Sequence, residues 1–350
     1  MTATREAPRV VVADDSAFMR RLIADVLARD GLDVVAEAAN GREAIAACRE
    51  HRPDVLSLDL AMPEVDGLGV LRELRASNGL KIVVVSSFSE QGGIRAVDAL
   101  AEGAFELVPK RASGGKLQDF LDDLLGKIQA AAGERQPKHD RVRPRAPAPA
   151  APHRRLSSRR SDQDTKRLVM IASSTGGPRA LTKVAASFPE RMGQGLVIVQ
   201  HMPAGFTGSL AARLDADCGL SIAEAEEGAK LDSMHGWVAP GGRHTHIRRK
   251  RIELSDEPPV AGLRPCADTT IIDAVSAYGG DIVLAVLTGM GRDACKGAAL
   301  VKASGGTVIA EHADTTTVNG MPRAVIEAGL ADAVLPIDEI GAALVEAAGG

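Results

Sequence analysis

Short apolar runs alternate with amphipathic, helix-length stretches along both halves of the chain. In the first half the apolar runs occupy positions 10–12, 34–35, 55–56, 82–85 and 107–108. Short β-branched runs separated by helical patterns are typical of a parallel sheet covered by helices on both faces. Residues 1–130 are therefore predicted to form an α/β domain with a doubly wound, five-stranded parallel sheet.

The second half repeats this alternation without repeating the sequence. Apolar runs at 168–171, 196–199 and 282–287 are each followed by a helical pattern. Right-handed crossovers would place those helices on both faces of a parallel sheet. Between Ser221 and Pro259 the pattern changes to short strands interrupted by polar residues, which predicts an antiparallel hairpin insertion. Residues 166–350 are thus expected to form a second doubly wound α/β domain.

The connection over residues 131–165 has a different composition. Between Ala131 and Lys166 ten basic residues stand against four acidic ones, five prolines occur, and large apolar side chains are almost absent. Such a segment cannot bury enough surface to fold, so a flexible linker is predicted. A solvated tether is favoured over a segment that contacts acidic surfaces, although the sequence leaves both interpretations open.

Composition narrows the class of protein. The 350 residues are 45% apolar but only 2% aromatic, so two cores would be built mainly from Ala, Val, Leu and Ile. No apolar run has the length of a membrane span, and the N-terminus lacks a signal-peptide layout. The four cysteines form no CxxC pair and are predicted to be reduced. A cytoplasmic protein without membrane insertion is expected. Nucleic-acid binding is not, because the excess positive charge is confined to the linker.

Polar side chains follow several strand ends of the first domain. They are Asp14, Asp15, Asp59, Ser86 and Lys110. Carboxyl ends of neighbouring parallel strands meet in one crevice, so these groups should converge. Three crowded carboxylates favour a hard cation such as Mg²⁺, and Asp59 could accept a phosphoryl group as an acyl phosphate. For Asp15 taken alone, a helix N-cap is an adequate explanation.

These residues resemble the receiver domains of bacterial response regulators. The resemblance is carried by Asp14-Asp15-Ser16, Leu58-Asp59-Leu60-Ala61-Met62-Pro63, Asp66-Gly67, Ser86 and Lys110. It implies a flavodoxin-like fold, Mg²⁺ bound by Asp14, Asp15 and Asp59, and phosphorylation of Asp59 by a histidine kinase. Two positions depart from the usual pattern. Pro109 precedes the lysine instead of following it, and Leu107 stands where an aromatic residue is common.

The segment at 171–178 directly follows the first predicted strand of the second domain. Gly176 and Gly177 allow a tight strand-to-helix turn, and Pro178 suits the first helical position. Ser174 would then lie at the carboxyl end of a strand, beside the unpaired amides of a helix N-terminus. An α/β fold can hold a nucleophile and oxyanion donors in this place. A plain N-cap serine is the alternative.

His201 and Asp293 also lie just beyond predicted parallel strands. Adjacent strands are about 5 Å apart, so these side chains and Ser174 can meet across one crevice. The imidazole would accept the serine proton and the carboxylate would orient the imidazole. Amides near Thr175–Gly177, or those of the Gly289-Met290-Gly291 loop, could stabilise an oxyanion. The order Ser…His…Asp, and Ala172 in place of the first glycine of G-x-S-x-G, exclude an α/β-hydrolase.

Simpler interpretations exist for each residue. His201 alone could be structural, and Asp293 could cap a helix that begins at Ala294. The Gly289-x-Gly291-x-x-Ala294 pattern is a weak dinucleotide signal, and Glu311 fits the ribose-binding position poorly. His244-x-His246 could present two imidazoles to a metal, but no third ligand is evident in the sequence.

The second domain resembles the CheB family of chemotaxis protein-glutamate methylesterases. The shared segments are Ser174-Thr175-Gly176-Gly177, Gln200-His201-Met202-Pro203, Ala239-Pro240-Gly241, Leu287-Thr288-Gly289-Met290-Gly291 with Asp293, and Gly320-Met321-Pro322-Arg323. The resemblance implies Ser174 as nucleophile, His201 as general base and Asp293 as its partner. It further implies hydrolysis of glutamyl methyl esters, and deamidation of glutamines, on methylated chemoreceptors. No cofactor is needed for that step, and phosphorylation of Asp59 would uncover Ser174.

Three residues of the second domain depart from the family pattern. Ala172-Ser173 replaces a usual Gly-Ala, and Ala294 replaces a glycine after the aspartate. Ser173 therefore offers a second hydroxyl as a rival nucleophile. Two other functions stay open at this point. One is a receiver-controlled esterase or amidase outside chemotaxis, and the other is a non-enzymatic, phosphorylation-gated binding module.

Overall fold

The computed structural model describes residues 7–75, 77, 79–87, 89–110, 117–133 and 166–349. The chain divides into two compact units, Met1–Val142 and Arg143–Gly350, and each is described by itself. Most of the predicted linker, residues 134–165, lies outside the described residues. No helix of the described part is both long and apolar enough to cross a membrane.

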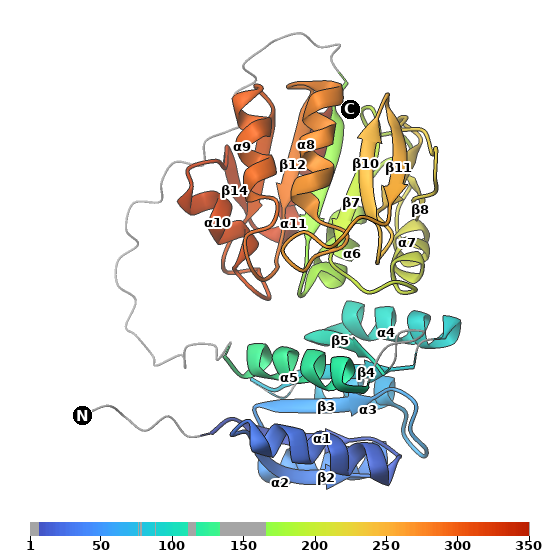
Figure 1. The fold of residues 1–350 in the computed structure, drawn as a ribbon, viewed down its shortest axis with the longest axis vertical. Helices are drawn as coiled ribbons and strands as arrows, with labels where there is room; N and C mark the ends of the chain where they lie inside the picture. The colour runs from blue at the N-terminus through green and yellow to red at the C-terminus, as the bar shows by residue number, and fades with distance from the viewer. Residues whose placement is uncertain are drawn as a thin grey trace, which may run out of the picture. The chain divides into compact units, whose positions relative to one another are not determined.

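The first unit contains a five-stranded parallel sheet in the order β2-β1-β3-β4-β5 (Figure 1). The strands are β1 (Arg9–Ala13), β2 (Asp33–Ala38), β3 (Val55–Asp59), β4 (Lys81–Ser86) and β5 (Glu106–Pro109). The helices are α1 (Ala17–Arg29), α2 (Gly41–His51), α3 (Gly67–Leu74), α4 (Glu90–Glu102) and α5 (Leu117–Gly133). α1 packs against α5, and α3 packs against both α2 and α4. The prediction of a doubly wound, five-stranded sheet is confirmed.

Side-chain caps set where the helices of this unit begin. Ser16, Asn40, Asp66 and Ser89 are extended residues whose side chains accept a hydrogen bond from the backbone amide three residues later. Each cap satisfies an amide that has no partner within its own helix. After β1 the short polar segment Asp14–Ser16 therefore turns directly into α1, whereas a seven-residue loop joins β3 to α3. This leaves the acidic residues at the carboxyl edge of the sheet.

The second unit is built on a seven-stranded parallel sheet in the order β14-β13-β12-β6-β7-β9-β8. The strands are β6 (Leu168–Ser173), β7 (Leu196–Gln200), β8 (Ser221–Glu224), β9 (His235–Val238), β12 (Ile282–Val286), β13 (Thr307–Glu311) and β14 (Ala333–Leu335). The chain runs outward from β6 through β7 to the edge strand β8, returns to β9 between β7 and β8, and then crosses to β12 on the other side of β6. The sheet therefore has its topological switch between β6 and β12, where open α/β sheets bind their ligands.

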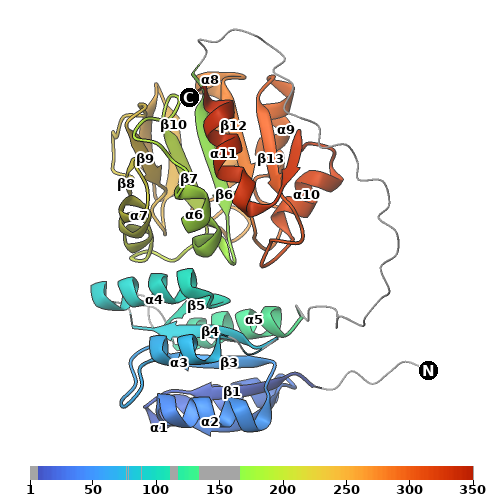
Figure 2. The same ribbon diagram turned by 180° about the vertical axis from the view of Figure 1, so that it is seen from behind.

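Helices cover both faces of this sheet. The face turned toward the viewer in Figure 1 carries α8 (Ala267–Tyr278), α9 (Cys295–Ala303) and α10 (Met321–Glu327). The opposite face, shown in Figure 2, carries α6 (Gly177–Ala185), α7 (Thr207–Ala216) and α11 (Ile337–Ala348). Alternate residues of β6, β7 and β12, among them Met170, Ala172 and Leu284, join one buried cluster with Ile271 of α8 and Ala298 of α9. Ser173, the neighbour of Ala172 in the strand, therefore points to the α6 side.

The segment at 221–259 divides into two parts. β10 (His244–Arg248) and β11 (Arg251–Ser255) form the predicted antiparallel hairpin, which packs on α8. β8 and β9 instead extend the main sheet, each pairing in parallel. Their polar interruptions follow from their place, since β8 is the edge strand and alternates buried with exposed residues.

The close packing of α8 against α9 predicts the effect of one substitution. A Cβ at Gly297 would lie 2.7 Å from Ile271 Cβ, so Gly297→Ala should overpack this contact. We expect the free energy of unfolding to fall by about 1–2 kcal/mol, because overpacking outweighs the gain in helix propensity. Urea unfolding of the full chain, followed by fluorescence of the single tryptophan, Trp237 in β9, measures this.

Gly208→Ala in α7 is the matched control, because its Cβ would meet Glu224 at an ordinary 3.5 Å. That substitution should be neutral or stabilise by about 0.5–1 kcal/mol. Equal effects of the two substitutions would contradict the packing argument.

Candidate active site and acidic cluster

Ser174 and His201 are the first residues beyond two neighbouring strands, β6 and β7. Ser173 and Gln200 are register partners, and the His201 amide donates to Ser173 O at 3.0 Å. On the other side of β6, the Ser174 amide donates to Thr288 O, also at 3.0 Å. The predicted nucleophile therefore lies between the ends of β7 and β12, at the topological switch of the sheet.

Two glycines give the turn after Ser174 its shape. Gly176 caps α6 with a positive φ of 78°, and a Cβ there would lie 2.4 Å from Thr317. Gly177 opens α6, and a Cβ there would lie 1.9 Å from Gln200 Oε1. Only glycine tolerates the positive φ at position 176 and leaves room for the close contacts at positions 176 and 177. This agrees with the tight turn expected from the sequence.

His201 and Asp293 meet at this edge. His201 Nε2 lies 2.8 Å from Asp293 Oδ2, and the side chains are only 9% and 5% exposed. A carboxylate accepts hydrogen bonds, so the proton of the neutral imidazole belongs on Nε2. Nδ1 is thereby left as the basic nitrogen.

Donors from two segments surround the Asp293 carboxylate. The Ala267 amide donates to Oδ2 at 2.6 Å, and the amides of Asp268 and Ala294 donate to Oδ1 at 2.9 Å. The Cys266 thiol lies 3.3 Å from Oδ1. The carboxylate thus occupies the N-terminus of α8, where backbone amides and the helix dipole favour negative charge.

The interpretation of Asp293 as the N-cap of the following helix is wrong. Ala294 occupies the N-cap position of α9, with a left-handed φ of 72° and no side-chain cap. Asp293 turns instead to the first amides of α8, twenty-six residues earlier in the chain. This backbone conformation accounts for a glycine at position 294 in the family pattern, since an L-residue is strained there.

Opposing effects set the pKa of Asp293. Burial by itself raises the pKa of this carboxyl, but the hydrogen bond from His201 and those from the Asp268 and Ala267 amides outweigh it. The result is a pKa well below the ordinary value of an aspartate. Asp293 is therefore ionised throughout the neutral range and can hold an imidazolium.

The two neighbouring serines differ in their surroundings. Ser173 is completely buried and its hydroxyl donates to Gln200 Oε1 at 2.6 Å. Ser174 is only partly buried. The hydroxyl flagged by the sequence as a rival nucleophile is thus shielded from solvent and already engaged.

Two of the amides considered for an oxyanion hole are engaged elsewhere. Gly177 N donates to Ser174 O at 2.7 Å, and Gly289 N donates to Val318 O at 2.9 Å. A Cβ at Gly289 would lie 2.7 Å from Ser174 Cβ, so this loop packs directly on the turn at Ser174. Met290 follows with half of its surface exposed.

Sequence reasoning missed a supporting network behind this loop. Thr288 Oγ1 donates to Thr175 O at 2.9 Å, and its amide donates to Glu311 Oε2 at 2.8 Å. Glu311 is completely buried, which raises the pKa of its carboxyl against the opposing hydrogen bond from Thr288. The only signal in the sequence was the place of Glu311 at the end of a strand. Its partners are the distant Thr288 amide and the nearby Thr315 hydroxyl.

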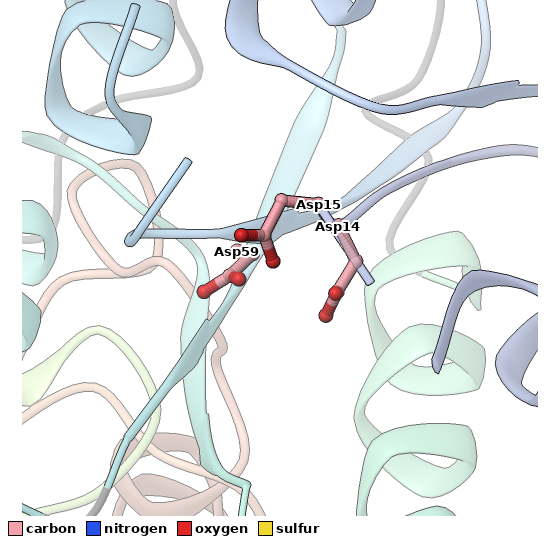
Figure 3. A group of neighbouring side chains, drawn as sticks. All are labelled: Asp14, Asp15 and Asp59. Atoms are coloured by element: carbon pink, nitrogen blue, oxygen red, sulfur yellow. The ribbon is translucent and has the colours of Figure 1, made fainter. Parts of the chain in front are cut away.

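The first unit gathers three carboxylates at the carboxyl edge of its sheet (Figure 3). Asp14 and Asp15 directly follow β1, and Asp59 ends β3. One ligand atom from each lies within 4.8 Å of the others, and Asp15 is the exposed member. This is the single group of its kind among the described residues. His244 and His246 form no such group. His246 Nδ1 pairs with Asp273 at 2.6 Å.

Lys110 reaches the same acidic cluster. Its Nζ lies 2.6 Å from Asp59 Oδ2 and 2.9 Å from Asp14 Oδ2. Burial alone lowers the pKa of Lys110, but the bonds to Asp59 and Asp14 outweigh it and raise that pKa. For Asp59, burial raises the pKa and the Lys110 bond offsets this only in part. Ser86 is buried nearby with its hydroxyl bound to Gly92 O at 3.0 Å.

Leu107 lies on β5 and is buried, at 1% exposure. A branched aliphatic side chain therefore fills the position where receivers commonly carry an aromatic residue.

Comparison with known proteins bears on both units. A family model described as CheB methylesterase matches residues 169–344, and one described as response regulator receiver domain matches residues 10–122. A Clostridium acetobutylicum protein named protein-glutamate methylesterase/protein-glutamine glutaminase is 38% identical over 338 residues, covering 96% of each chain. A protein of the same name from Symbiobacterium thermophilum is 40% identical over 355 residues, covering 97% of each chain.

Among solved structures, the Thermotoga maritima CheB methylesterase catalytic domain matches the second unit. It has a TM-score of 0.50 and 42% identity, and it covers 52% of this chain and 98% of that chain.

The low pKa of Asp293 predicts how the stability of this unit depends on pH. An unfolded aspartate has a pKa of about 3.9, so the ionised carboxylate stabilises the fold above about pH 4. This contribution is lost as the pH falls through the lower pKa of the folded state. Asp293→Asn should therefore cost about 2–4 kcal/mol at pH 7, and the cost should shrink below about pH 4.

Urea unfolding between pH 3 and 7, followed by Trp237 fluorescence, gives this difference. Asp314→Asn, at an exposed aspartate, is the control and should change little at any pH. A cost of Asp293→Asn that stays constant with pH would contradict the assignment.

Proposed function

This chain belongs to the CheB family of protein-glutamate methylesterases and protein-glutamine glutaminases, and from that premise we infer its reaction and the residues that perform it. The enzyme hydrolyses glutamyl methyl esters and deamidates glutamine side chains of chemoreceptors in chemotaxis. Ser174 is the nucleophile, His201 the general base and Asp293 the group that orients and stabilises the imidazole.

Acylation begins when Ser174 Oγ attacks the ester carbonyl carbon. The serine proton passes to His201 Nδ1, since Nε2 is already bound to Asp293. The imidazolium formed in this step lies against an ionised carboxylate, which lowers the barrier. The tetrahedral intermediate collapses as the Nδ1 proton passes to the leaving methoxide. Methanol departs and leaves an acyl-enzyme.

Deacylation uses the same groups with water as the nucleophile. His201 takes a proton from water as its oxygen attacks the acyl carbon, and then returns the proton to Ser174 Oγ. The product is a glutamate side chain. With a glutamine substrate the first leaving group is ammonia, and every later step is identical. Besides the substrate, the two steps use only water and the side chains of the protein.

The oxyanion of each tetrahedral intermediate requires donors in place before the reaction. The amides of Gly177 and Gly289 are engaged within the protein. The amides of Gly176 and Met290 are the proposed donors. Met290 directly follows Gly289, which packs on Ser174, and half of its surface is exposed.

One observation carries this proposal above the others. The buried 2.8 Å contact between His201 and Asp293 lies at the same sheet edge as the partly exposed Ser174. A purely structural histidine would not need an ionised partner. A serine that only caps a helix would not need a histidine or a carboxylate beside it. The contact favours a hydrolase over a binding module.

The first unit supplies control. Its three carboxylates offer the oxygen-only ligand set that suits Mg²⁺, and Asp14, Asp15 and Asp59 would hold the ion. Mg²⁺ supplies positive charge that neutralises an incoming phosphoryl group. Asp59 accepts that group from a chemotaxis-type histidine kinase, with Lys110 paired to the same carboxylate. Phosphorylation of Asp59 raises the rate of hydrolysis at Ser174, and methylated chemoreceptors are the substrate.

The nucleophile assignment is tested by methanol release from radiolabelled methylated receptor. Ser174→Ala should lower the rate by on the order of 10³-fold or more, since removal of a triad nucleophile leaves only binding and oxyanion stabilisation. Ser173→Ala keeps the triad and should retain a measurable rate. If Ser174→Ala releases methanol at the native rate, the nucleophile has been misassigned.

Control by the receiver is tested with a small phosphodonor. Methanol release by the native protein should increase when phosphodonor and Mg²⁺ are added together, and chelation of Mg²⁺ should abolish the increase. Asp59→Asn should show no increase, because an amide cannot accept the phosphoryl group. Asp33→Asn, at an exposed position on β2, should respond like the native protein. An Asp59→Asn variant that still responds would exclude Asp59 as the acceptor.

A further inference from the structure

We propose that the buried pair Ser173–Gln200 positions the nucleophile and the general base relative to each other. This proposal rests on the proposed function, in which Ser174 and His201 act together. Neither Ser173 nor Gln200 touches substrate in this account. Both are positioning residues that act through the main chain of the two catalytic ones.

Gln200 binds to both catalytic residues at once. Its Nε2 donates to Ser174 O at 2.9 Å and to His201 O at 3.0 Å. Both amide protons of the side chain are thereby used, one on each carbonyl. The final main-chain link of the β6–β7 ladder joins His201 N to Ser173 O, and the Gln200 side chain adds a further link beyond it. The amide therefore fixes the separation of the two residues where the strands end.

The two carbonyls set which way the Gln200 amide points, and the Ser173 hydroxyl completes its hydrogen bonding. Its hydroxyl donates to Gln200 Oε1 at 2.6 Å, and both side chains are at most 2% exposed. If the amide were flipped, its oxygen would face two carbonyl oxygens, which can only repel it. In the observed orientation the serine hydroxyl donates to the amide oxygen, so every polar atom of the Gln200 side chain is hydrogen-bonded.

Gly177 leaves the room that this arrangement requires. A Cβ at that position would lie 1.9 Å from Gln200 Oε1 and 3.0 Å from Ser173 Cβ. Gly177, which opens α6, is thus needed for the Ser173–Gln200 pair as well as for the turn after Ser174. The alanine-to-serine departure at position 173 gains a physical role, since it supplies the donor.

The test compares Gln200→Met, Ser173→Ala and their combination in the full chain. The readout is the rate at which a small fluorophosphonate modifies Ser174, because this rate reports the nucleophile–base geometry without receptor binding. Gln200→Met should lower it by about 10–100-fold, in line with the effect of a misplacement of about 1 Å. Ser173→Ala should lower it by about 3–10-fold, the loss of one orienting bond.

The double variant separates positioning from independent effects. It should be no slower than Gln200→Met alone, since Ser173 acts only through that amide. Thr182→Val is the matched control. It removes a hydroxyl-to-carbonyl bond in α6, from Thr182 Oγ1 to Pro178 O at 3.0 Å, and should change the rate by less than about twofold. If Gln200→Met does not fold, Ser173→Ala carries the test, because it removes a single oxygen atom.

Three outcomes overturn the proposal. Gln200→Met within twofold of the native rate, additive effects of the two substitutions, or an equal loss in Thr182→Val would each exclude positioning. Failure of the proposed function gives a different result. Ser174→Ala would then retain methanol release, whatever the behaviour of position 200.

Discussion

The buried carboxylate of Asp293 holds the candidate active site together. It belongs to the loop after β12, receives the first amides of α8 and binds the imidazole that follows β7. Three segments that are far apart in the chain are thereby joined at one negative charge. A charge of this kind is stable away from water only when donors surround it, so the fold around it has little freedom to shift. The position of His201, the proposed general base, follows from this constraint.

Ser174, the proposed nucleophile, depends on a second constraint, the close approach of backbone segments. Gly176, Gly177 and Gly289 each stand where a Cβ would lie within 2.7 Å of another residue. The turn at Ser174 is therefore packed between the loop after β12 and the Gln200 side chain. An alcohol acts as a nucleophile only if its base and its oxyanion donors are placed in advance. Here the placement comes from packing and from hydrogen bonds to the main chain.

The two units use one structural rule for different chemistry. In each, parallel strands deliver polar side chains to the carboxyl edge of a sheet. In the first unit the edge collects Asp14, Asp59 and Lys110, a charge arrangement suited to a cation and a phosphoryl group. In the second it collects a serine, a histidine and one carboxylate. The chemistry changes with the side chains, and the scaffold does not.

The sequence by itself determined the five strands of the first sheet, the strands β6, β7 and β12 of the second, the parallel character of both sheets and the residues that follow these strand ends, because burial of short apolar runs is a local property of the chain. It therefore predicted Ser174, His201 and Asp293 together. Only the tertiary structure decided that Asp293 accepts hydrogen bonds from the first amides of α8 instead of capping α9, and that the Ser173 hydroxyl donates to Gln200. It also decided that β8 and β9 extend the main sheet. Each of these depends on contacts between segments distant in sequence. No local pattern encodes which donor will meet which acceptor once the chain has folded.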